Sequence, residues 1–202
     1  MGNPKLVAVE PPPDAPLRGR SDDELMILVR AGLAEALRVL AERHMGRLAG
    51  FCGKFLGDPP VGQEIAQQTW LQVWAHRASY QSQDRFTVFL YTIARNLCRN
   101  ELRRRARLGS WLDGTAHDTH LASVAADDPS HLDALLSRER SRELLRALAK
   151  IPEPQREAML LRFDEELSYE EMAAVLGASE STLRSRVHHG LRALREAMGR
   201  SS

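Results

Sequence analysis

The sequence lacks the features that mark several common classes of protein. It has two cysteines in 202 residues, Cys52 and Cys98, too few for a disulfide framework or, alone, for a zinc site. Both lie among apolar positions, which favours buried thiols. No apolar run approaches the roughly 18 residues that span a bilayer, and residues 1–20 contain no signal-peptide core. We therefore expect a soluble, cytoplasmic protein that does not insert into a membrane.

Catalytic and metal-binding patterns are also missing. The seven histidines show no ligand spacing, and a metal role for His117 and His120 is disfavoured. The chain has neither a glycine-rich phosphate loop nor a Gly-x-Ser-x-Gly nucleophile motif. These absences predict a protein that is not an enzyme and that needs no cofactor or metal.

Lysine is scarce, with three lysines among 28 basic residues, and the formal net charge is +1. Arginine binds phosphates and base edges better than lysine does, although arginine codons in a GC-rich genome would explain most of this bias equally well. The small net charge argues against a uniformly basic DNA-binding protein. It hides a strong segregation, however, because residues 95–107 carry six arginines against Glu101, whereas residues 108–133 carry five aspartates and no lysine or arginine.

The apolar spacing is helical along most of the chain and strand-like alternation is absent, which predicts an all-α fold. Residues 1–20 hold five prolines and are predicted to be a disordered tail. A first helix should begin after the cap Ser21 and run through Leu40, and a second should end at the turn before Pro59. Further helices are expected at about 61–77, 86–107, 134–151, 154–164, 168–176 and 180–198. This pattern divides the chain into two small helical domains, residues 21–107 and 134–202, joined by a flexible acidic linker, residues 108–133.

A basic ridge is expected on the helix at 86–107. Arg95, Arg99 and Arg103 are spaced four residues apart, and Asn96 and Asn100 lie beside them. Arginines can hold phosphates while asparagine amides reach base edges, so this pattern favours nucleic-acid binding. A solvated helix end, where cations are also favourable, is the alternative interpretation.

The stretch LSYEEMAAVLGASESTLRSRVHHGLRAL, residues 167–194, predicts a helix-turn-helix. Ser168 and Glu171 form a capping box, Gly177 supplies the left-handed residue that ends the first helix, and Ser179 can cap the second. A structural helical hairpin is the alternative. The acidic segment 153–171 would be repelled by DNA and should face away from it or toward a basic protein. The second helix offers a face that could read the major groove: Ser181, Thr182, Arg184, Ser185, Arg186 and His188.

Taken together, these segments resemble the bacterial extracytoplasmic-function sigma factors of the sigma-70 family. The resemblance covers about Asp22–Met198, in the family's order and spacing. It rests on GQEIAQQTWLQVW, FLYTIARNLCRNELRRRAR, KIPEPQREAMLLRF and the helix-turn-helix. It implies a bundle called region 2 at 21–107, a helix-turn-helix called region 4 at 134–202, and a promoter-specificity subunit of RNA polymerase. The implied partners are core polymerase, through its β′ clamp helices and β flap, promoter DNA, and an anti-sigma factor, which is common in the family.

The resemblance also assigns roles to individual positions. In three places the chain departs from the family's usual pattern: Gly62-Gln63-Glu64 replaces Ala-Glu-Asp, Phe89 replaces the frequent Trp before Leu-Tyr, and His189-Gly190 replaces Arg-Ala. Tyr80 could equally be a core aromatic. The positions implied to dock on core polymerase are Glu64, Gln67, Gln68, Leu71 and Trp74. Those implied to capture unstacked −10 bases are Ser79, Tyr80, Gln81, Arg95, Asn96, Arg99, Asn100 and Arg103.

Two other classes of protein remain as alternatives. A conventional helix-turn-helix regulator would use its N-terminal half for dimerisation or effector binding, but the 62–107 motif disfavours this. An enzyme or interaction module with an incidental helical hairpin is disfavoured by the absence of catalytic spacing. The leading hypothesis is a dissociable transcription-initiation factor that binds both polymerase and promoter.

Overall fold

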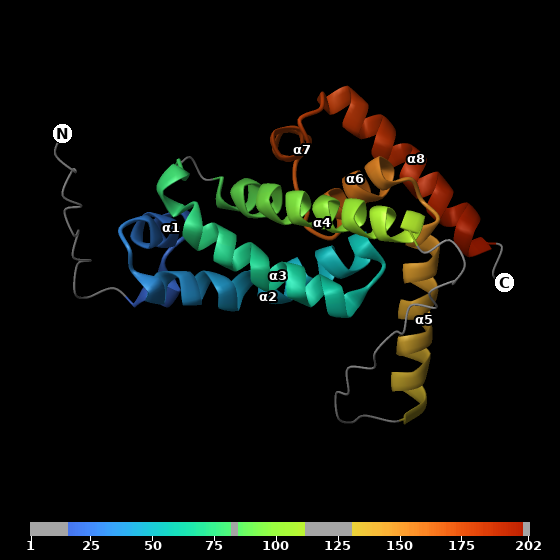
Figure 1. The fold of residues 1–202 in the computed structure, drawn as a ribbon, viewed down its shortest axis with the longest axis horizontal. Helices are drawn as coiled ribbons and strands as arrows, with labels where there is room; N and C mark the ends of the chain where they lie inside the picture. The colour runs from blue at the N-terminus through green and yellow to red at the C-terminus, as the bar shows by residue number, and fades with distance from the viewer. Residues whose placement is uncertain (1–15, 82–84, 112–130, 200–202) are drawn as a thin grey trace.

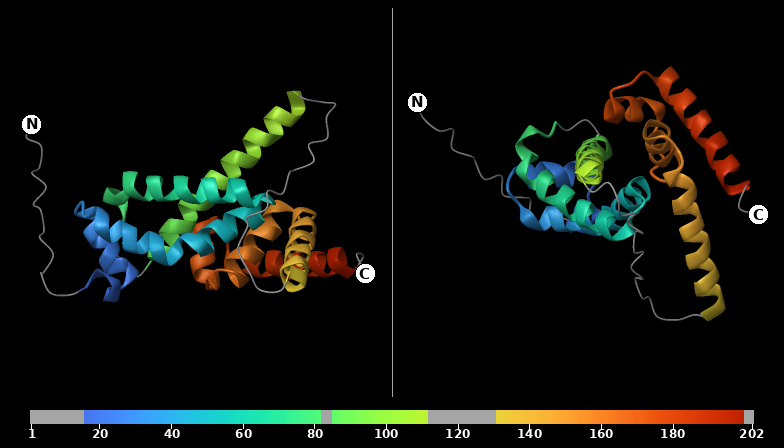
Figure 2. Two further views of the ribbon diagram at one scale, coloured as in Figure 1. Left: turned by 90° about the horizontal axis from the view of Figure 1, so that it is seen from below. Right: turned by 45° about the vertical axis from the view of Figure 1, so that its right-hand side comes forward.

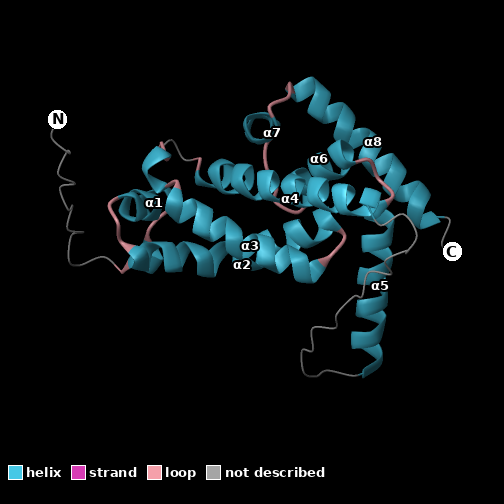
Figure 3. Cartoon of the chain, viewed as in Figure 1, coloured by secondary structure: helices cyan, strands magenta, loops and turns pink. Residues whose placement is uncertain are grey.

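The computed structural model describes residues 16–81, 85–111 and 131–199 (Figure 1). Every regular element in these ranges is a helix (Figure 3), which confirms the all-α fold. No helix in the described part of the chain is long and apolar enough to cross a membrane. Most of the predicted tail and of the predicted linker lies outside the described residues. The start of order was predicted too late, because a 3-10 helix, η1 (Leu17–Gly19), precedes Ser21.

Four α-helices form an N-terminal domain, and the first of them starts as expected. Ser21 caps α1 in a capping box with Glu24. The prediction that this helix continues to Leu40 is wrong, because Gly32 adopts a φ of +99° and separates α1 from α2. Glycine is the residue that tolerates this conformation. The elements are α1 (Asp22–Arg30), α2 (Ala34–Leu56), α3 (Pro59–Ala75), the 3-10 helix η2 (Arg77–Ser79) and α4 (Phe86–Trp111).

Helices α2 and α3 cross where two glycines meet. Gly57, at φ +67°, ends α2, and the Asp58 side chain then caps α3. A Cβ atom added at Gly62 would overlap the backbone N and Cα of Gly53 and would lie 3.0 Å from the carbonyl carbon of Cys52. The departure from the family's usual alanine at position 62 therefore has a packing reason: the two backbones approach too closely for a methyl group.

Helix α4 lies across α2 and α3 and is longer than expected. It continues to Trp111, four residues past the predicted end at 107, and its last turns project away from the helical body (Figure 2, left). Its inner face joins an aromatic core, in which the Tyr91 ring meets Phe51 edge-on at 5.2 Å and Phe86 lies against Trp70. This core fixes the rotation of α4 and thereby decides which of its arginines face outward.

The C-terminal domain contains the predicted helix-turn-helix. The capping box of Ser168 and Glu171 is present, and Gly177 ends α7 at φ +62°. Gly190 lies at the crossing of α6 and α8, where an added Cβ would stand 2.9 Å from the Met159 sulfur. The helices are α5 (His131–Ala149), α6 (Glu153–Phe163), α7 (Tyr169–Leu176) and α8 (Glu180–Gly199).

The two domains pack directly on each other. Helix α6 lies against α2, and α7 lies against α4; Figure 1 shows α6 and α7 beside α4. One hydrophobic core runs through both domains, and the Arg156 guanidinium sits 5.5 Å from the centre of the Phe55 ring across the boundary. The sequence pattern predicted two domains but did not predict this contact.

Candidate nucleic-acid interface

The outer face of α8 presents the polar side chains that the sequence pattern predicted for it. Leu183 and Val187 are buried on its inner side, against the rest of the C-terminal domain. The Ser179 hydroxyl accepts a hydrogen bond from the Thr182 backbone N–H at 3.3 Å and so caps the helix. Of the six candidate residues, Arg186 is half-buried and the others are exposed: Ser181, Thr182, Arg184, Ser185 and His188.

Arg184 is held in place by two neighbours. Its guanidinium donates to Glu180 at 3.0 Å and lies 4.2 Å from the centre of the Tyr169 ring. The ion pair is solvent-exposed and therefore contributes little to stability. The stacked ring, which comes from α7, restricts the side chain without burying its charge. Such preorganisation lowers the entropy lost when a guanidinium binds a base edge or a phosphate.

The α4 ridge, defined as Arg95, Asn96, Arg99, Asn100 and Arg103, is divided between solvent and the C-terminal domain. Asn96, Asn100 and Arg103 are exposed. Arg95 pairs with Glu157 at 2.6 Å, and Arg99 pairs with Glu153 at 3.0 Å. The ridge therefore exists as one face of a helix, but its two N-terminal arginines already have carboxylate partners.

A pocket of about 310 Å³ opens beside the ridge, between the end of α3, η2 and α4. Its volume is at the lower end of the roughly 300–1,000 Å³ range of ligand pockets. Apolar side chains of α4 line one part of the pocket, and amide, hydroxyl and imidazole groups line the rest. This mixture suits a planar aromatic group with a polar edge. The lining residues are Gln72, His76, Ser79, Phe89, Thr92, Ile93, Asn96 and Leu97.

Tyr80 is a core residue in this structure, so its assignment as a direct −10 contact is corrected. Its side chain is 2% exposed, its hydroxyl donates to Asp23, and its ring packs edge-on against Phe89 at 5.2 Å. Arg30 also donates to the Tyr80 carbonyl at 3.2 Å. These contacts anchor the segment on which the exposed Ser79 and Gln81 stand.

The outer face of α3 is polar apart from one exposed leucine. Glu64, Gln67 and Gln68 are exposed, and Leu71 is 70% exposed, more than any other large apolar side chain in the described part of the chain. Trp74 is half-buried, and the Arg77 guanidinium lies 4.3 Å from the centre of its ring. A single exposed apolar side chain is common on protein surfaces and does not by itself mark a contact site. The structure brings all five predicted polymerase-contact residues onto one helix face or its edge.

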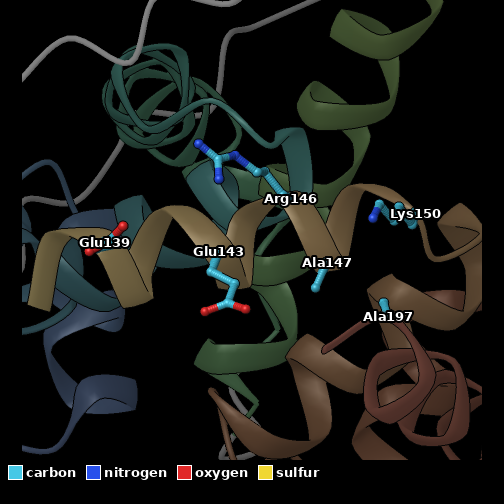
Figure 4. A pocket seen from close by; sticks show the side chains of 6 residues that line it. All are labelled: Glu139, Glu143, Arg146, Ala147, Lys150 and Ala197. Carbon is cyan, nitrogen blue, oxygen red and sulfur yellow. The ribbon is translucent and has the colours of Figure 1, made fainter. Parts of the chain in front are cut away.

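A second pocket, of about 300 Å³, lies between α5 and α8 (Figure 4). Its charged groups do not converge, because Arg146 and Glu143 point to opposite sides of α5. Opposite charges that diverge from one another do not select a charged ligand. Within the described ranges, no group of three or more histidine, cysteine or acidic side chains could hold a metal ion.

Two buried glutamates at the domain boundary were not among the residues singled out from the sequence, although the acidic segment that contains them was. Glu157 and Glu165 are 2% and 8% exposed, and burial raises the pKa of both carboxyl groups above the ordinary value of 4.5. Tyr91 donates its hydroxyl to Glu165, and burial beside this carboxylate raises the pKa of Tyr91. The sequence feature that could have pointed to these two residues is the acidity of segment 153–171, which contains both. Segment 153–171 was expected to face away from DNA or toward a basic protein; in this structure it pairs with basic residues of the N-terminal domain.

Comparison with known proteins gives matches in both domains. Residues 40–108 match the family Sigma-70 region 2, and residues 141–194 match Sigma-70, region 4. The chain is 34% identical over 170 residues to the RNA polymerase sigma factor CarQ of Myxococcus xanthus, covering 84% of this chain and 93% of that protein. It is 26% identical over 173 residues to the ECF RNA polymerase sigma factor SigW of Bacillus subtilis, covering 84% and 92%.

Solved structures share the fold. CnrH, in complex with the cytosolic domain of CnrY, superposes with a TM-score of 0.66 at 22% identity, covering 90% of this chain and 99% of that one. The sigma factor RpoE of Bartonella quintana, in complex with the anti-sigma factor NepR, also gives a TM-score of 0.66, at 23% identity over 80% and 96% of the two chains.

Proposed function

The chain belongs to the extracytoplasmic-function RNA polymerase sigma factors of the sigma-70 family, and on that premise we propose which of its surfaces direct promoter-specific initiation. Helix α8 contacts the −35 element, the α4 ridge and its pocket hold the −10 element, and the outer face of α3 binds core polymerase. The N-terminal domain, expected at 21–107, corresponds to region 2, and the C-terminal domain, expected at 134–202, corresponds to region 4.

The observation that carries the −35 proposal is the division of α8 into two faces. Leu183 and Val187 are buried, while the hydroxyl, guanidinium and imidazole groups of the opposite face point to solvent. A helix held this way by a helix-turn-helix can enter the major groove with its N-terminal residues against base edges. Arg184 and Arg186 are the strongest candidates for base contacts, since a guanidinium can donate two parallel hydrogen bonds to guanine.

The pocket beside Asn96 supports the −10 proposal. Single-stranded DNA is bound by a combination of stacking surfaces, polar groups and cations. Phe89 supplies an aromatic surface in the pocket, and Asn96 and Ser79 supply polar groups at it. Arg103, exposed on the same ridge, can hold the strand's phosphates. An unstacked base could therefore enter the pocket while the backbone follows the ridge.

Two further proposals follow from family membership. The chemistry of RNA synthesis belongs to the polymerase, and this chain supplies recognition and strand separation without a cofactor of its own, in the cytoplasm. Its partners include an anti-sigma factor, because the similar fold of RpoE has been solved in complex with an anti-sigma factor. The inhibitor would control access to the surfaces named above.

The test is reconstituted transcription. Purified chain is added to core RNA polymerase, and run-off RNA is measured from a library of genomic promoter fragments of the source bacterium. We expect transcripts that core polymerase alone does not make. Absence of such transcripts, together with tight binding of the chain alone to duplex DNA, would favour the conventional regulator.

A matched pair of variants tests the α3 surface in the same assay. Leu71→Asp should abolish co-purification with core polymerase, because it places a charge in an apolar contact. Ile27→Asp, on α1, is the control, since Ile27 is also an exposed apolar residue, at 47%. Equal loss of polymerase binding in both variants, with both folded by circular dichroism, would contradict the assignment of α3.

A further inference from the structure

Tyr80 is held by both ends of helix α1. Its hydroxyl donates to the carboxylate of Asp23 in the first turn of α1, and its carbonyl accepts a hydrogen bond at 3.2 Å from Arg30, the last residue of α1. Asp23 and Arg30 lie about two turns apart on the same side of the helix, so the two contacts are separated by about 10 Å along its axis. One short helix therefore fixes both the side chain and the backbone of Tyr80.

The contact between Asp23 and Tyr80 is buried and polar. Asp23 is 8% exposed and Tyr80 is 2% exposed. The capping box of Ser21 and Glu24 already completes the start of α1, so Asp23 is not needed as a cap. Burying a carboxylate costs free energy, and two well-packed apolar side chains of similar volume are often at least as stable. What the polar pair adds is direction, because a hydrogen bond to a carboxylate fixes the orientation of the donor.

The orientation of Tyr80 determines the position of one wall of the α3–α4 pocket. The Tyr80 ring meets the Phe89 ring edge-on, with centroids 5.2 Å apart and planes at 67°. Phe89 lines the pocket, and so does Ser79, which directly precedes Tyr80 in the chain. Tyr80 itself lies behind this lining. A continuous series of contacts therefore leads from Asp23 through Tyr80 to an aromatic and a hydroxyl group of the pocket.

The Ser79 side of the pocket depends on such support. Ser79 is exposed and belongs to η2, a 3-10 helix of three residues, and so short a 3-10 helix has little stability of its own. On one side η2 is held by Arg77, whose guanidinium donates to the Trp74 carbonyl at 2.8 Å. On the other side it is held by Tyr80. A binding site discriminates well only when its groups are held within about 0.5 Å of the productive geometry.

We propose that Asp23 is a positioning residue for recognition of the −10 element. It orients Tyr80, and Tyr80 sets the positions of Phe89 and Ser79 in the pocket, while Asp23 itself does not contact DNA. The proposal rests on the proposed function, since it assumes that the pocket receives an unstacked base. It gives α1 a role in promoter specificity, although α1 carries none of the residues proposed to contact DNA or polymerase.

Four single variants separate positioning from simple stability. Tyr80→Phe removes the hydroxyl and keeps the ring. Asp23→Ala removes the acceptor, whereas Asp23→Asn keeps an oxygen that can accept from the Tyr80 hydroxyl. The matched control is Asp22→Ala, which removes the neighbouring carboxylate of the same turn. Asp22 pairs with Arg43 and with His44, each at 2.6 Å, and neither partner lines the pocket. Circular dichroism and urea unfolding establish that all four variants fold.

The first experiment measures base discrimination by each variant assembled with core RNA polymerase. The probes are fluorescein-labelled single strands that carry the −10 sequence of a promoter that the wild-type chain transcribes, with each base changed in turn. Their affinities are measured by anisotropy. Discrimination is the ratio of the affinity for the original base to that for its substitutes. A purely structural role would weaken binding to all of these strands alike and would leave the ratio unchanged.

We expect discrimination at one −10 position to fall about tenfold in Asp23→Ala and in Tyr80→Phe, because either change breaks the same hydrogen bond to a carboxylate. The double variant Asp23→Ala/Tyr80→Phe should lose no more than either single variant. Asp23→Asn and Asp22→Ala should stay near the wild-type ratio, and all variants should bind core polymerase as the wild-type chain does. Wild-type ratios in Asp23→Ala and Tyr80→Phe, or an equal loss in Asp22→Ala, would overturn the proposal.

A second experiment needs neither DNA nor polymerase. A nitroxide is attached at Gln81→Cys, an exposed position next to Tyr80, while the buried native cysteines remain unlabelled. We expect the broad electron paramagnetic resonance spectrum of a restrained label in the wild-type, Asp23→Asn and Asp22→Ala backgrounds. The lines should narrow in Asp23→Ala and Tyr80→Phe, because the segment is released from α1. Identical spectra in all backgrounds would contradict the hold of Asp23 on this segment.

The two proposals can fail separately. If the wild-type chain gives run-off transcripts and the −10 ratios are unchanged in Asp23→Ala and Tyr80→Phe, the proposed function stands and the positioning role fails. If the wild-type chain gives no run-off transcript, the proposed function fails, and the role of Asp23 in −10 recognition fails with it, whatever the spin-label spectra show.

Discussion

The two surfaces proposed to contact DNA are presented in opposite ways. On α8, the recognition face is open to solvent apart from the half-buried Arg186, and its apolar side is buried within its own domain. On α4, the ridge is covered at Arg95 and Arg99 by carboxylates of the other domain and open at Asn96, Asn100 and Arg103.

The difference shows that amphipathicity places a helix but does not determine what its polar face meets. Both helices bury their apolar side chains as their sequence patterns require. Glutamates of α6, the helix that packs against α8, pair with arginines of α4. Opposite charges on two domains of one chain meet readily because the chain keeps them at high effective concentration.

The largest effect is expected for Gly62→Ala, which would disrupt the close crossing of α2 and α3 in the N-terminal domain. The added methyl group would overlap the backbone of Gly53, which cannot move as a side chain can. We expect a loss of about 3 kcal/mol in the free energy of unfolding, from forced separation of α2 and α3. Urea unfolding followed by circular dichroism measures it.

Two other glycines serve as comparisons for Gly62. Gly50→Ala, at an exposed site on α2 with no atom within 4 Å of an added Cβ, should stabilise by about 0.5–1 kcal/mol. Gly190→Ala, at the crossing that supports α8, should cost less than Gly62→Ala, because the Met159 thioether can shift. If all three alanine variants had equal stability, the close crossing of α2 and α3 would not matter.

The exposed face of α8 is tested by the variant Arg186→Ala, assembled with core RNA polymerase. Loss of a bidentate contact should cost about 1–3 kcal/mol of binding to promoter duplex and relax the base preference at one −35 position. Arg192→Ala, an exposed arginine further along α8, is the control. Equal weakening on all −35 sequences would show that Arg186 holds only phosphate.

The uncovered part of the ridge is tested by Asn96→Ala. Removing one amide that hydrogen-bonds a base should weaken −10 complex formation by about 1 kcal/mol, while binding to core polymerase stays at the wild-type level. Open-complex formation on −10 variants and co-purification with core measure the two effects. Loss of polymerase binding in this variant would contradict the separation of the α3 and α4 surfaces.

The smallest effect is expected in the pH dependence of two glutamates that pair with arginines of α4, Glu157 and Glu101. Burial raises the pKa of Glu157 above 4.5 in the folded chain, so its contribution to stability is fully present below 4.5 and is lost as pH rises through the folded pKa. Hydrogen bonds from Arg104, and then from Arg105, lower the pKa of Glu101. Its contribution is present above 4.5 and is lost as pH falls through the folded pKa.

Glutamine variants at Glu157 and Glu101 distinguish the two opposite pH dependences of stability. The unfolding free energy of the wild-type chain minus that of Glu157→Gln should decrease as pH rises from about 4 to about 8. The same difference for Glu101→Gln should increase as pH rises over the lower part of that range. Urea unfolding at several pH values measures both. Slopes of the same sign would contradict the burial of Glu157 at the domain boundary.

Much of the local structure was predictable from short patterns. The capping boxes at Ser21 and Ser168 and the left-handed Gly177 are encoded within four residues, and the structure contains all three. The break between α1 and α2 was misplaced because the apolar spacing continues across it, and only the backbone conformation of Gly32 reveals the turn. Gly62 and Gly190 stood out in the sequence only as departures from the family's usual alanines, because their role depends on a second helix that crosses there.

The candidate surfaces also divide into residues that a local pattern identifies and residues whose surroundings depend on tertiary contacts. The exposed residues of α3 and α8 could be assigned because a helix with one apolar face must expose the other. Tyr80 could not be assigned, since a tyrosine beside a polar loop can face DNA or the core, and only its contacts with Asp23 and Phe89 decide. The partners of Arg95 and Arg99 lie more than 50 residues away in the chain, at Glu157 and Glu153.

By itself, the sequence determined what is local or periodic in this protein: its helices, their caps, their polar faces, the segregation of its charge and its membership of a family. Only the tertiary structure decided which charged faces meet, which glycines separate crossing helices and which half of the α4 ridge stays open. The physical reason is that caps and periodicity involve residues within a turn or two of each other. Burial and ion pairing between α4 and α6 depend instead on distances that arise only when the two domains pack.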